Sequence, residues 1–151
     1  MSEPLSLSIA SSQKRITSFV IDDIVISVFF IIIFYDQFAQ VFANITVVDE
    51  AALESVNAFI AENLLVVLSI KLIYHTVLVW QNGMTLGKYL MKIQVIDLET
   101  GEIPSFQKAF LRASVRIPSE VLFYFGFLMA FIVPLKQTLH DKVSNCVVVN
   151  D

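Results

Sequence analysis

Two adjacent aspartates, Asp22 and Asp23, interrupt a run that is otherwise apolar from Ile16 to Phe34. A helix of that length, at about 1.5 Å per residue, can cross the hydrocarbon core of a bilayer. A charged side chain near the bilayer centre costs about 2.5 to 3.5 kcal/mol on insertion scales, so it is retained where it is paired, hydrated or functional. Neighbouring carboxylates also repel each other, which favours the binding of a proton or cation between them. The pair is therefore a candidate ion or proton site.

A second apolar run, from about Leu64 to Trp80, contains Lys71 and His75. These two residues are four positions apart, so a helix places them on one face. If the two runs form antiparallel helices, the aspartate pair lies opposite this lysine and histidine at a similar depth in the membrane. Two interpretations follow. Either the four side chains form a structural contact between helices, or the surplus negative charge is an ion site that Lys71 and His75 modulate.

The composition is that of a membrane protein rather than a soluble domain. Hydrophobic residues make up 56% of the 151 residues and charged residues 16%, whereas soluble domains usually have about 45 to 50% and about 25%. The single Cys146 excludes an internal disulfide, and two histidines with one cysteine do not make a zinc site. We expect an all-α integral membrane protein: a polar tail at residues 1–14 and one membrane domain at residues 15–151, whose first span is an uncleaved anchor.

Acidic and basic residues are segregated along the chain. The stretch from Tyr35 to Asn63 carries only acidic charges, whereas the stretch from Met84 to Ile117 carries five lysines and arginines. Because lysine and arginine mark cytoplasmic loops, this pattern predicts a cytoplasmic N-terminus and an acidic loop outside the cell. A helical period in that loop continues into the second span. It predicts a projecting helical hairpin that turns near Asn44 to Asp49.

The C-terminal half has a different pattern. Alternation from Tyr89 to Val95 predicts a strand, which we place at Lys92 to Ile96. Its expected partner is the β-branched segment from Cys146 to Val149, so that the two form a small cytoplasmic β pair. Between them, the short apolar run from Val121 to Leu135 is either a third span or a re-entrant hairpin. Pairing of the strands would place both on one side of the membrane, which favours re-entry.

A basic stripe lies on the helix that Ser105 is placed to cap. Lys108, Arg112 and Arg116 recur every four residues opposite an apolar face. This pattern predicts an amphipathic helix in the membrane interface, with the stripe directed towards anionic headgroups. The alternative is an ordinary amphipathic helix that packs on protein.

The segment at residues 83–88 looks like a phosphate-binding loop but departs from that motif. Three residues rather than four separate its glycines, and Tyr89 rather than serine or threonine follows the lysine. We expect the glycines to form a tight exit from the second span, with Thr85 as a possible cap.

His140 and Asp141 resemble half of a catalytic relay, but no serine or cysteine nucleophile context accompanies them. We expect these two residues instead to form a structural hydrogen bond, or to contact Arg15, Arg112 or Arg116 near the inner interface. The chain is therefore not expected to be an enzyme, to carry a cofactor or a metal, or to bind nucleic acid.

Three separated blocks resemble the RDD family of bacterial membrane proteins. The blocks are Arg15 to Asp22 (RITSFVID), then Gly83 to Asp97 (GMTLGKYLMKIQVID) followed by Gly101, Ser105 and Arg112, and last Gln137 to Asp141 (QTLHD) followed by Val147 to Val149. The resemblance rests on their order and spacing. It implies a polytopic protein of the bacterial inner membrane, with the family's eponymous residues at Arg15, Asp22 and Asp141. Asn145-Cys146 stands where many members have Gly-Thr.

The resemblance implies no settled activity, although ion or solute transport is proposed for the family. The favoured function is transport of small monovalent cations coupled to protons. Asp22 and Asp23 would form the ion site, with Lys71 and His75 as modulators. Two or three spans cannot enclose a path, so this function requires a homo-oligomer. The alternative is a non-catalytic membrane scaffold that binds partners or anionic lipid through the basic stripe.

Overall fold

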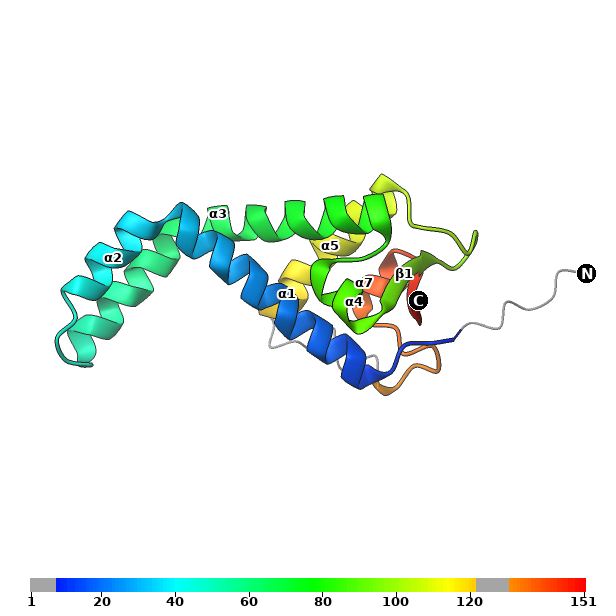
Figure 1. The fold of residues 1–151 in the computed structure, drawn as a ribbon, viewed down its shortest axis with the longest axis horizontal. Coiled ribbons are helices and arrows are strands. Elements are labelled where there is room, and N and C mark those ends of the chain that lie inside the picture. The colour runs from blue at the N-terminus through cyan, green and yellow to red at the C-terminus, as the bar shows by residue number, and fades with distance from the viewer. Residues whose placement is uncertain (1–7, 122–130) are drawn as a thin grey trace, which may run out of the picture.

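The computed structural model describes residues 8–121 and 131–151. Its longest elements are two helices, α1 (Ser12–Ile33) and α3 (Glu50–Asn82), with α2 (Tyr35–Ala43) between them. α1 and α3 come together near α2 and run apart towards the end that holds the remaining elements (Figure 1). The molecule is therefore an elongated helical hairpin with a small packed unit at one end.

Capping residues mark both ends of α3 and the N-terminal end of α1. Ser11 caps α1 by accepting a hydrogen bond from the backbone N–H of Lys14 at 3.3 Å. Asp49 caps α3 in the same way, accepting from the N–H of Ala52 at 2.9 Å. α3 ends at Gly83, whose φ of 69° is a left-handed conformation that glycine adopts without strain. The predicted turn before α3 and the predicted exit at Gly83 are confirmed.

Both long helices are long and apolar enough to cross a membrane, as the two apolar runs predicted. Only 17% of the most apolar window of α1 and 11% of that of α3 are buried within the protein. A helix in the core of a soluble protein would bury most of such a window, so these exposed apolar surfaces fit a lipid environment. The projecting end of the predicted hairpin contains α2, which precedes the turn and is separated from α1 by a break at Phe34 that the sequence analysis did not predict.

The predicted β pair is confirmed. β1 (Ile93–Asp97) pairs antiparallel with β2 (Cys146–Asn150), with Val95 opposite Val148. The turn before β2 is made by Asn145, whose φ of 54° is left-handed. Asparagine tolerates this conformation better than most other residues with a Cβ.

The predicted alternation from Tyr89 is wrong at its N-terminal end. Residues 89–91 belong to a short helix, α4 (Leu86–Met91), and the chain turns at Lys92 with a φ of 53° before β1 begins. The backbone N–H of Gly87 in the first turn of α4 donates to Asp22 of α1 at 2.8 Å. This tertiary contact favours a helix start that the period of the local sequence does not reveal.

α5 (Phe106–Val121) packs along α3, and α7 (Leu139–Val143) packs against α5. Ser105 accepts a hydrogen bond from the N–H of Lys108 at 3.4 Å, which confirms its predicted role at the start of α5. The helix contains Pro118 and continues beyond it, although proline removes one backbone donor. Most of the predicted third apolar segment, residues 122–130, lies outside the described residues.

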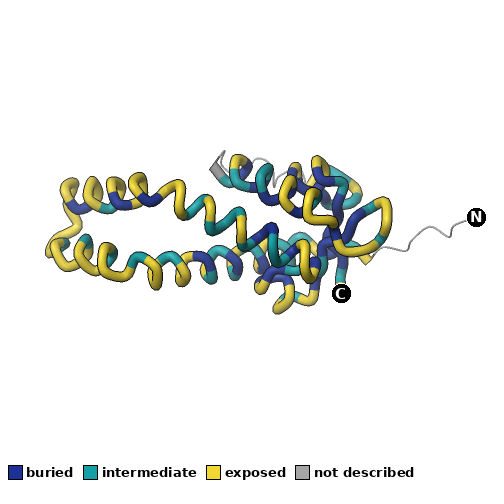
Figure 2. Tube along the Cα trace, turned by 90° about the horizontal axis from the view of Figure 1, so that it is seen from above, coloured by how far each residue is buried: buried dark blue, intermediate teal, exposed yellow. Residues whose placement is uncertain are grey.

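The buried residues gather at the packed end, and the hairpin is mostly exposed (Figure 2). One apolar cluster joins Val79 of α3 to the two strands and to Ala109 of α5. Its side chains are small or medium-sized, so the apolar core of this end is modest. Polar contacts between elements must therefore fix much of the arrangement of helices and strands at this end.

Gly87 allows α4 to cross closely over α1. A Cβ atom at this position would overlap the backbone oxygen of Ser18 and lie 2.9 Å from Oδ1 of Asp22. Since one of these neighbours is backbone, it cannot rotate away. The crossing therefore requires glycine for close approach, and this approach brings α4 within hydrogen-bonding distance of Asp22.

We predict that Gly87→Ala destabilises the packed end by about 1 to 3 kcal/mol, the usual cost of overpacking. The measurement is thermal unfolding of the detergent-solubilised protein followed by circular dichroism. Leu90→Ala is the matched control, because Leu90 lies in the same helix with 64% of its surface exposed. Equal unfolding temperatures for the two variants would contradict the close crossing.

Candidate functional site

Asp22 is fully buried and accepts hydrogen bonds from two other elements and the turn between them. Its Oδ1 accepts from the hydroxyl of Tyr74 on α3 and from the N–H of Gly87 on α4, each at 2.8 Å. Its Oδ2 accepts from the hydroxyl of Thr85 at 2.6 Å and lies 3.7 Å from the ammonium of Lys88. These donors satisfy the carboxylate as an anion and hold α1, α3 and α4 together.

Lys88 is a buried cation whose environment disfavours its charge. Burial lowers its pKa, and the guanidinium groups of Arg112 and Arg116 lower it further, whereas Asp22 opposes the shift. Its ammonium also donates to the hydroxyl of Thr85 at 3.3 Å. The carboxylate of Asp22 and the ammonium of Lys88 therefore form a buried pair that shares a hydroxyl between them.

Asp23 belongs to a second set of contacts, because consecutive helical residues point about 100° apart. Its Oδ1 lies 3.1 Å from the ammonium of Lys71 on α3, which also lies 2.8 Å from Oε2 of Glu120 on α5. Glu120 in turn accepts a hydrogen bond from Nε of Arg116 at 2.8 Å. This chain of charges links α1, α3 and α5 on the side of α1 next to Asp22.

The predicted arrangement of the two aspartates against Lys71 and His75 holds for Lys71 and Asp23 only. Nδ1 of His75 lies 3.3 Å from Nη1 of Arg116 and not against either aspartate. The reason is that α5 packs along α3, so Arg116 occupies the space beside His75 that the prediction assigned to α1. The aspartates thus form two separate sites rather than one paired site.

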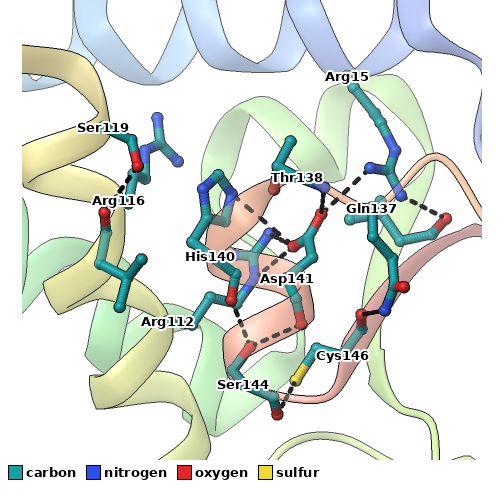
Figure 3. A network of polar contacts seen from close by, with 12 residues as sticks. Arg15, Arg112, Arg116, Ser119, Gln137, Thr138, His140, Asp141, Ser144 and Cys146 are labelled. Atoms are coloured by element: carbon teal, nitrogen blue, oxygen red, sulfur yellow. Dashed lines mark hydrogen bonds and ion pairs between the residues drawn. The ribbon is translucent and has the colours of Figure 1, made fainter. Parts of the chain in front are cut away.

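Asp141 is the centre of a third set of contacts (Figure 3). Its Oδ1 accepts from Nε and Nη2 of Arg112 at 2.8 and 2.6 Å, and its Oδ2 lies 3.2 Å from Nη1 of Arg15. The backbone N–H of Thr138 also donates to Oδ2, at 3.2 Å. Burial would raise the pKa of Asp141, but the two guanidinium groups hold it well below its usual range. The expected contacts of Asp141 with Arg15 and Arg112 are confirmed.

Arg15 and His140 complete this part of the packed end. Arg15 donates to the backbone oxygens of Lys136 and, at 3.2 Å, of Val148, so it ties α1 to the segment before α7 and to β2. Nε2 of His140 lies 3.8 Å from Oδ1 of Asp141. Burial keeps the pKa of His140 well below its usual range despite this carboxylate, so the imidazole is neutral at neutral pH.

The basic stripe of α5 faces the protein more than the membrane interface. Arg112 and Arg116 are buried and paired with Asp141 and Glu120. Lys108 lies 2.7 Å from a carboxylate oxygen of Asp97 and 3.0 Å from one of Glu99. The carboxylates of Asp141 and Glu120 thus take up charge of Arg112 and Arg116, and the expected contact of these arginines with lipid headgroups stays a prediction. The alternative of a helix packed on protein is favoured.

A cavity of about 330 Å³ is lined by the N-terminal turns of α1, the middle of α5, α7 and Lys88 of α4, among other residues. Among the residues lining its described walls are Arg15, Lys88, Arg112, Arg116 and Asp141. Lys88 is thus reached from this cavity, whereas its partner Asp22 lies behind it.

Sequence reasoning missed Tyr74, Thr85, Lys88 and Glu120 as members of these sites. Thr85 and Lys88 lie in the glycine-rich block at residues 83–88, which resembles a phosphate-binding loop but departs from that motif. That block marks a close approach of α4 to the carboxylate of Asp22 rather than to a nucleotide. Glu120 carried one available signal, its position four residues after Arg116 on a helix, which places the pair on one face.

We predict that Asp141→Asn destabilises the protein by about 3 to 5 kcal/mol, because it leaves two buried guanidinium groups without their counter-charge. Thermal unfolding in detergent measures the effect. Glu102→Gln removes an exposed carboxylate near the same end and serves as the control. A loss no larger than that of the control would contradict the central role of Asp141.

Acid should weaken the wild-type protein through the same residue. Since the pKa of Asp141 is lowered on folding, the unfolded chain takes up the proton first, and stability falls progressively below about pH 4. Asp141→Asn lacks this titration. Its unfolding temperature should decline less steeply between about pH 4 and pH 2 than that of the wild type, and parallel declines would contradict the assignment.

The comparisons with known proteins agree with the resemblance of the three sequence blocks. A model described as the RDD family matches residues 9–145, a range that contains Arg15, Asp22 and Asp141. No match was found among the curated proteins or among the solved structures. The family match and the two long apolar helices together support association with a membrane. The match spans most of the chain, and this protein therefore belongs to the RDD family.

Proposed function

We propose that this protein exchanges a small monovalent cation for a proton across a membrane, and that the pair of Asp22 and Lys88 is the exchange site. The observation that carries this proposal is the buried carboxylate–ammonium pair between Lys88 of α4 and Asp22 of α1, a helix long and apolar enough to span a bilayer. A carboxylate kept charged by an internal cation can accept an external cation only when the internal one gives up its charge.

The local oxygen atoms suit a small hard cation. The carboxylate of Asp22, the hydroxyls of Tyr74 and Thr85 and the backbone oxygen of Ser18 lie around the same space. Carboxylate, hydroxyl and carbonyl oxygens are the ligands that hard cations prefer. In the present arrangement donors occupy the carboxylate, so an incoming cation must replace the ammonium of Lys88.

The exchange balances in charge. The cation binds the carboxylate of Asp22, and Lys88 releases one proton to water and becomes a neutral amine. When the cation leaves, Lys88 takes up a proton and pairs with Asp22 again. Burial and the nearby guanidinium groups lower the pKa of Lys88, which reduces the cost of its deprotonation.

The remaining predicted residues have supporting roles in this proposal. Lys71 and Glu120 hold Asp23 in an ion-paired chain beside the exchange site. His75 contacts Arg116, one of the cations that act on Lys88. Because α1 and α3 cannot by themselves enclose a path, we place the exchange site in a homo-oligomer of the bacterial inner membrane, with the N-terminus in the cytoplasm.

A non-catalytic scaffold remains the competing function. Its original basis was a basic stripe open to headgroups, and the burial of Arg112 and Arg116 weakens that basis. Both functions are non-enzymatic. They differ in one measurable property, because a scaffold needs no proton movement when cations are added.

The test is proton flux in proteoliposomes that hold a pH gradient, measured as Na⁺, Li⁺ or K⁺ is added. We predict cation-triggered flux in the wild type and its loss in Asp22→Asn. Lys88→Arg is the sharper variant, because arginine keeps the positive charge beside Asp22 but does not deprotonate in proteins. It should therefore preserve folding and abolish proton exchange.

Asp36→Asn is the matched control, since Asp36 is an exposed carboxylate at the far end of the hairpin. It should leave the flux unchanged. Circular dichroism and elution as a single species establish folding for each variant. No flux from folded wild-type protein, or full flux in Lys88→Arg, would reject the exchange mechanism.

A further inference from the structure

The cavity beside α1 has an excess of positive charge along its walls. Within its described lining, four side chains are cationic (Arg15, Lys88, Arg112 and Arg116) and one, Asp141, is acidic. Lys88 is paired with Asp22 and Arg116 with Glu120, both behind the wall. Arg15 and Arg112 share the single carboxylate of Asp141. One positive charge at the cavity therefore has no counter-charge among the described side chains, counting the histidines as neutral.

Two of the arginines that line the cavity each have a guanidinium nitrogen with unused hydrogen-bonding capacity. In the described part of the chain, Nε of Arg15 and Nη2 of Arg116 are buried and lack a hydrogen-bond partner. Arg116 itself is only 3% exposed, and its guanidinium lies 5.0 Å from the ring centre of Phe19. A buried donor without an acceptor is costly, so these atoms indicate a place for an anionic oxygen ligand.

The rim of the cavity is apolar rather than charged. Ile16 and Val20, on successive turns of α1, are 54% and 48% exposed, and Phe131 is 66% exposed. All three lie on the rim or wall of the same cavity, next to the face of α1 that is apolar enough for lipid. A ligand that fits both parts has an anionic head and an apolar tail. Its head would lie near the first turns of α1, the depth of the headgroup layer if α1 spans the bilayer.

We propose that this cavity binds the phosphate group of one anionic phospholipid, whose acyl chains lie along the apolar face of α1. The phosphodiester supplies one negative charge for the surplus positive charge and acceptor oxygens for the two guanidinium groups. The cavity volume of about 330 Å³ lies within the usual range of ligand sites. This inference goes beyond the exchange function and does not depend on it.

The site differs from a basic surface that attracts lipid by charge alone. On α5, Arg116 lines the cavity, whereas Lys108 belongs to the same stripe but pairs with Asp97 and Glu99 outside it. Lipid binding in the cavity requires Arg116 and tolerates the loss of Lys108. A diffuse electrostatic surface would respond to both.

The experiment is lipid titration of the purified full chain in detergent, read by native mass spectrometry. Phosphatidylglycerol is compared with phosphatidylcholine of the same acyl chains. We expect the wild type to bind the anionic lipid about tenfold or more tightly, the ratio typical of one charge-assisted contact. Arg116→Gln should reduce this preference about tenfold, and Lys108→Gln should leave it unchanged.

Three results would overturn the proposal: equal binding of the two lipids, equal losses in Arg116→Gln and Lys108→Gln, and competition by millimolar inorganic phosphate. The last result would indicate a site for a free anion rather than for a lipid. If Arg116→Gln does not fold, a photoactivatable phosphatidylglycerol tests the wild type directly. Crosslinks should concentrate at residues 12–20 and at Phe131, and crosslinks spread along α3 would reject the cavity as the site.

Discussion

A buried charge in this protein needs partners from another element, and this requirement organises the packed end. Asp22 on α1 takes its donors from α3, α4 and the turn between them, and Asp141 on α7 takes its donors from α1 and α5. Removing one partner of a buried ion pair costs far more than the intact pair contributes. Each carboxylate therefore disfavours any arrangement in which its elements separate. The apolar core of this end is modest, and the contacts of Asp22 and Asp141 determine how its elements are arranged.

The same requirement explains why the two neighbouring aspartates diverge. Asp22 enters the interior, where hydroxyl and backbone donors satisfy it, and Asp23 remains half-buried beside Lys71. The interior set is nearly saturated, so a cation bound as proposed would have to replace the ammonium of Lys88. In the proposed exchange, proton coupling would follow from how fully the site is satisfied. An open pair of carboxylates would bind cations without any obligation to release a proton.

Unlike the surroundings of Asp22, the cavity beside α1 contains charges that are not fully paired. Arg15 and Arg112 share one carboxylate, and buried nitrogens of Arg15 and Arg116 lack acceptors in the described structure. An anionic lipid would complete this site and would also hold α1 against α5 and α7. Lys88 belongs both to the proposed exchange pair and to the lining of the proposed lipid cavity. The occupant of one site would then alter the electrostatic potential at the other.

The sequence by itself determined the features that depend on local signals. Apolar length identified the two long helices, Ser11, Asp49 and Gly83 set their ends, and β-branched residues identified the strand at Cys146. The expected contact of Asp141 with an arginine is also confirmed. Only the tertiary structure decided which partners the charges take. Periodicity places residues on a face of one helix but carries no information about which helix covers that face. The packing of α5 along α3 and the close crossing permitted by Gly87 assigned His75 to Arg116, Asp22 to α4 and the basic stripe to the interior.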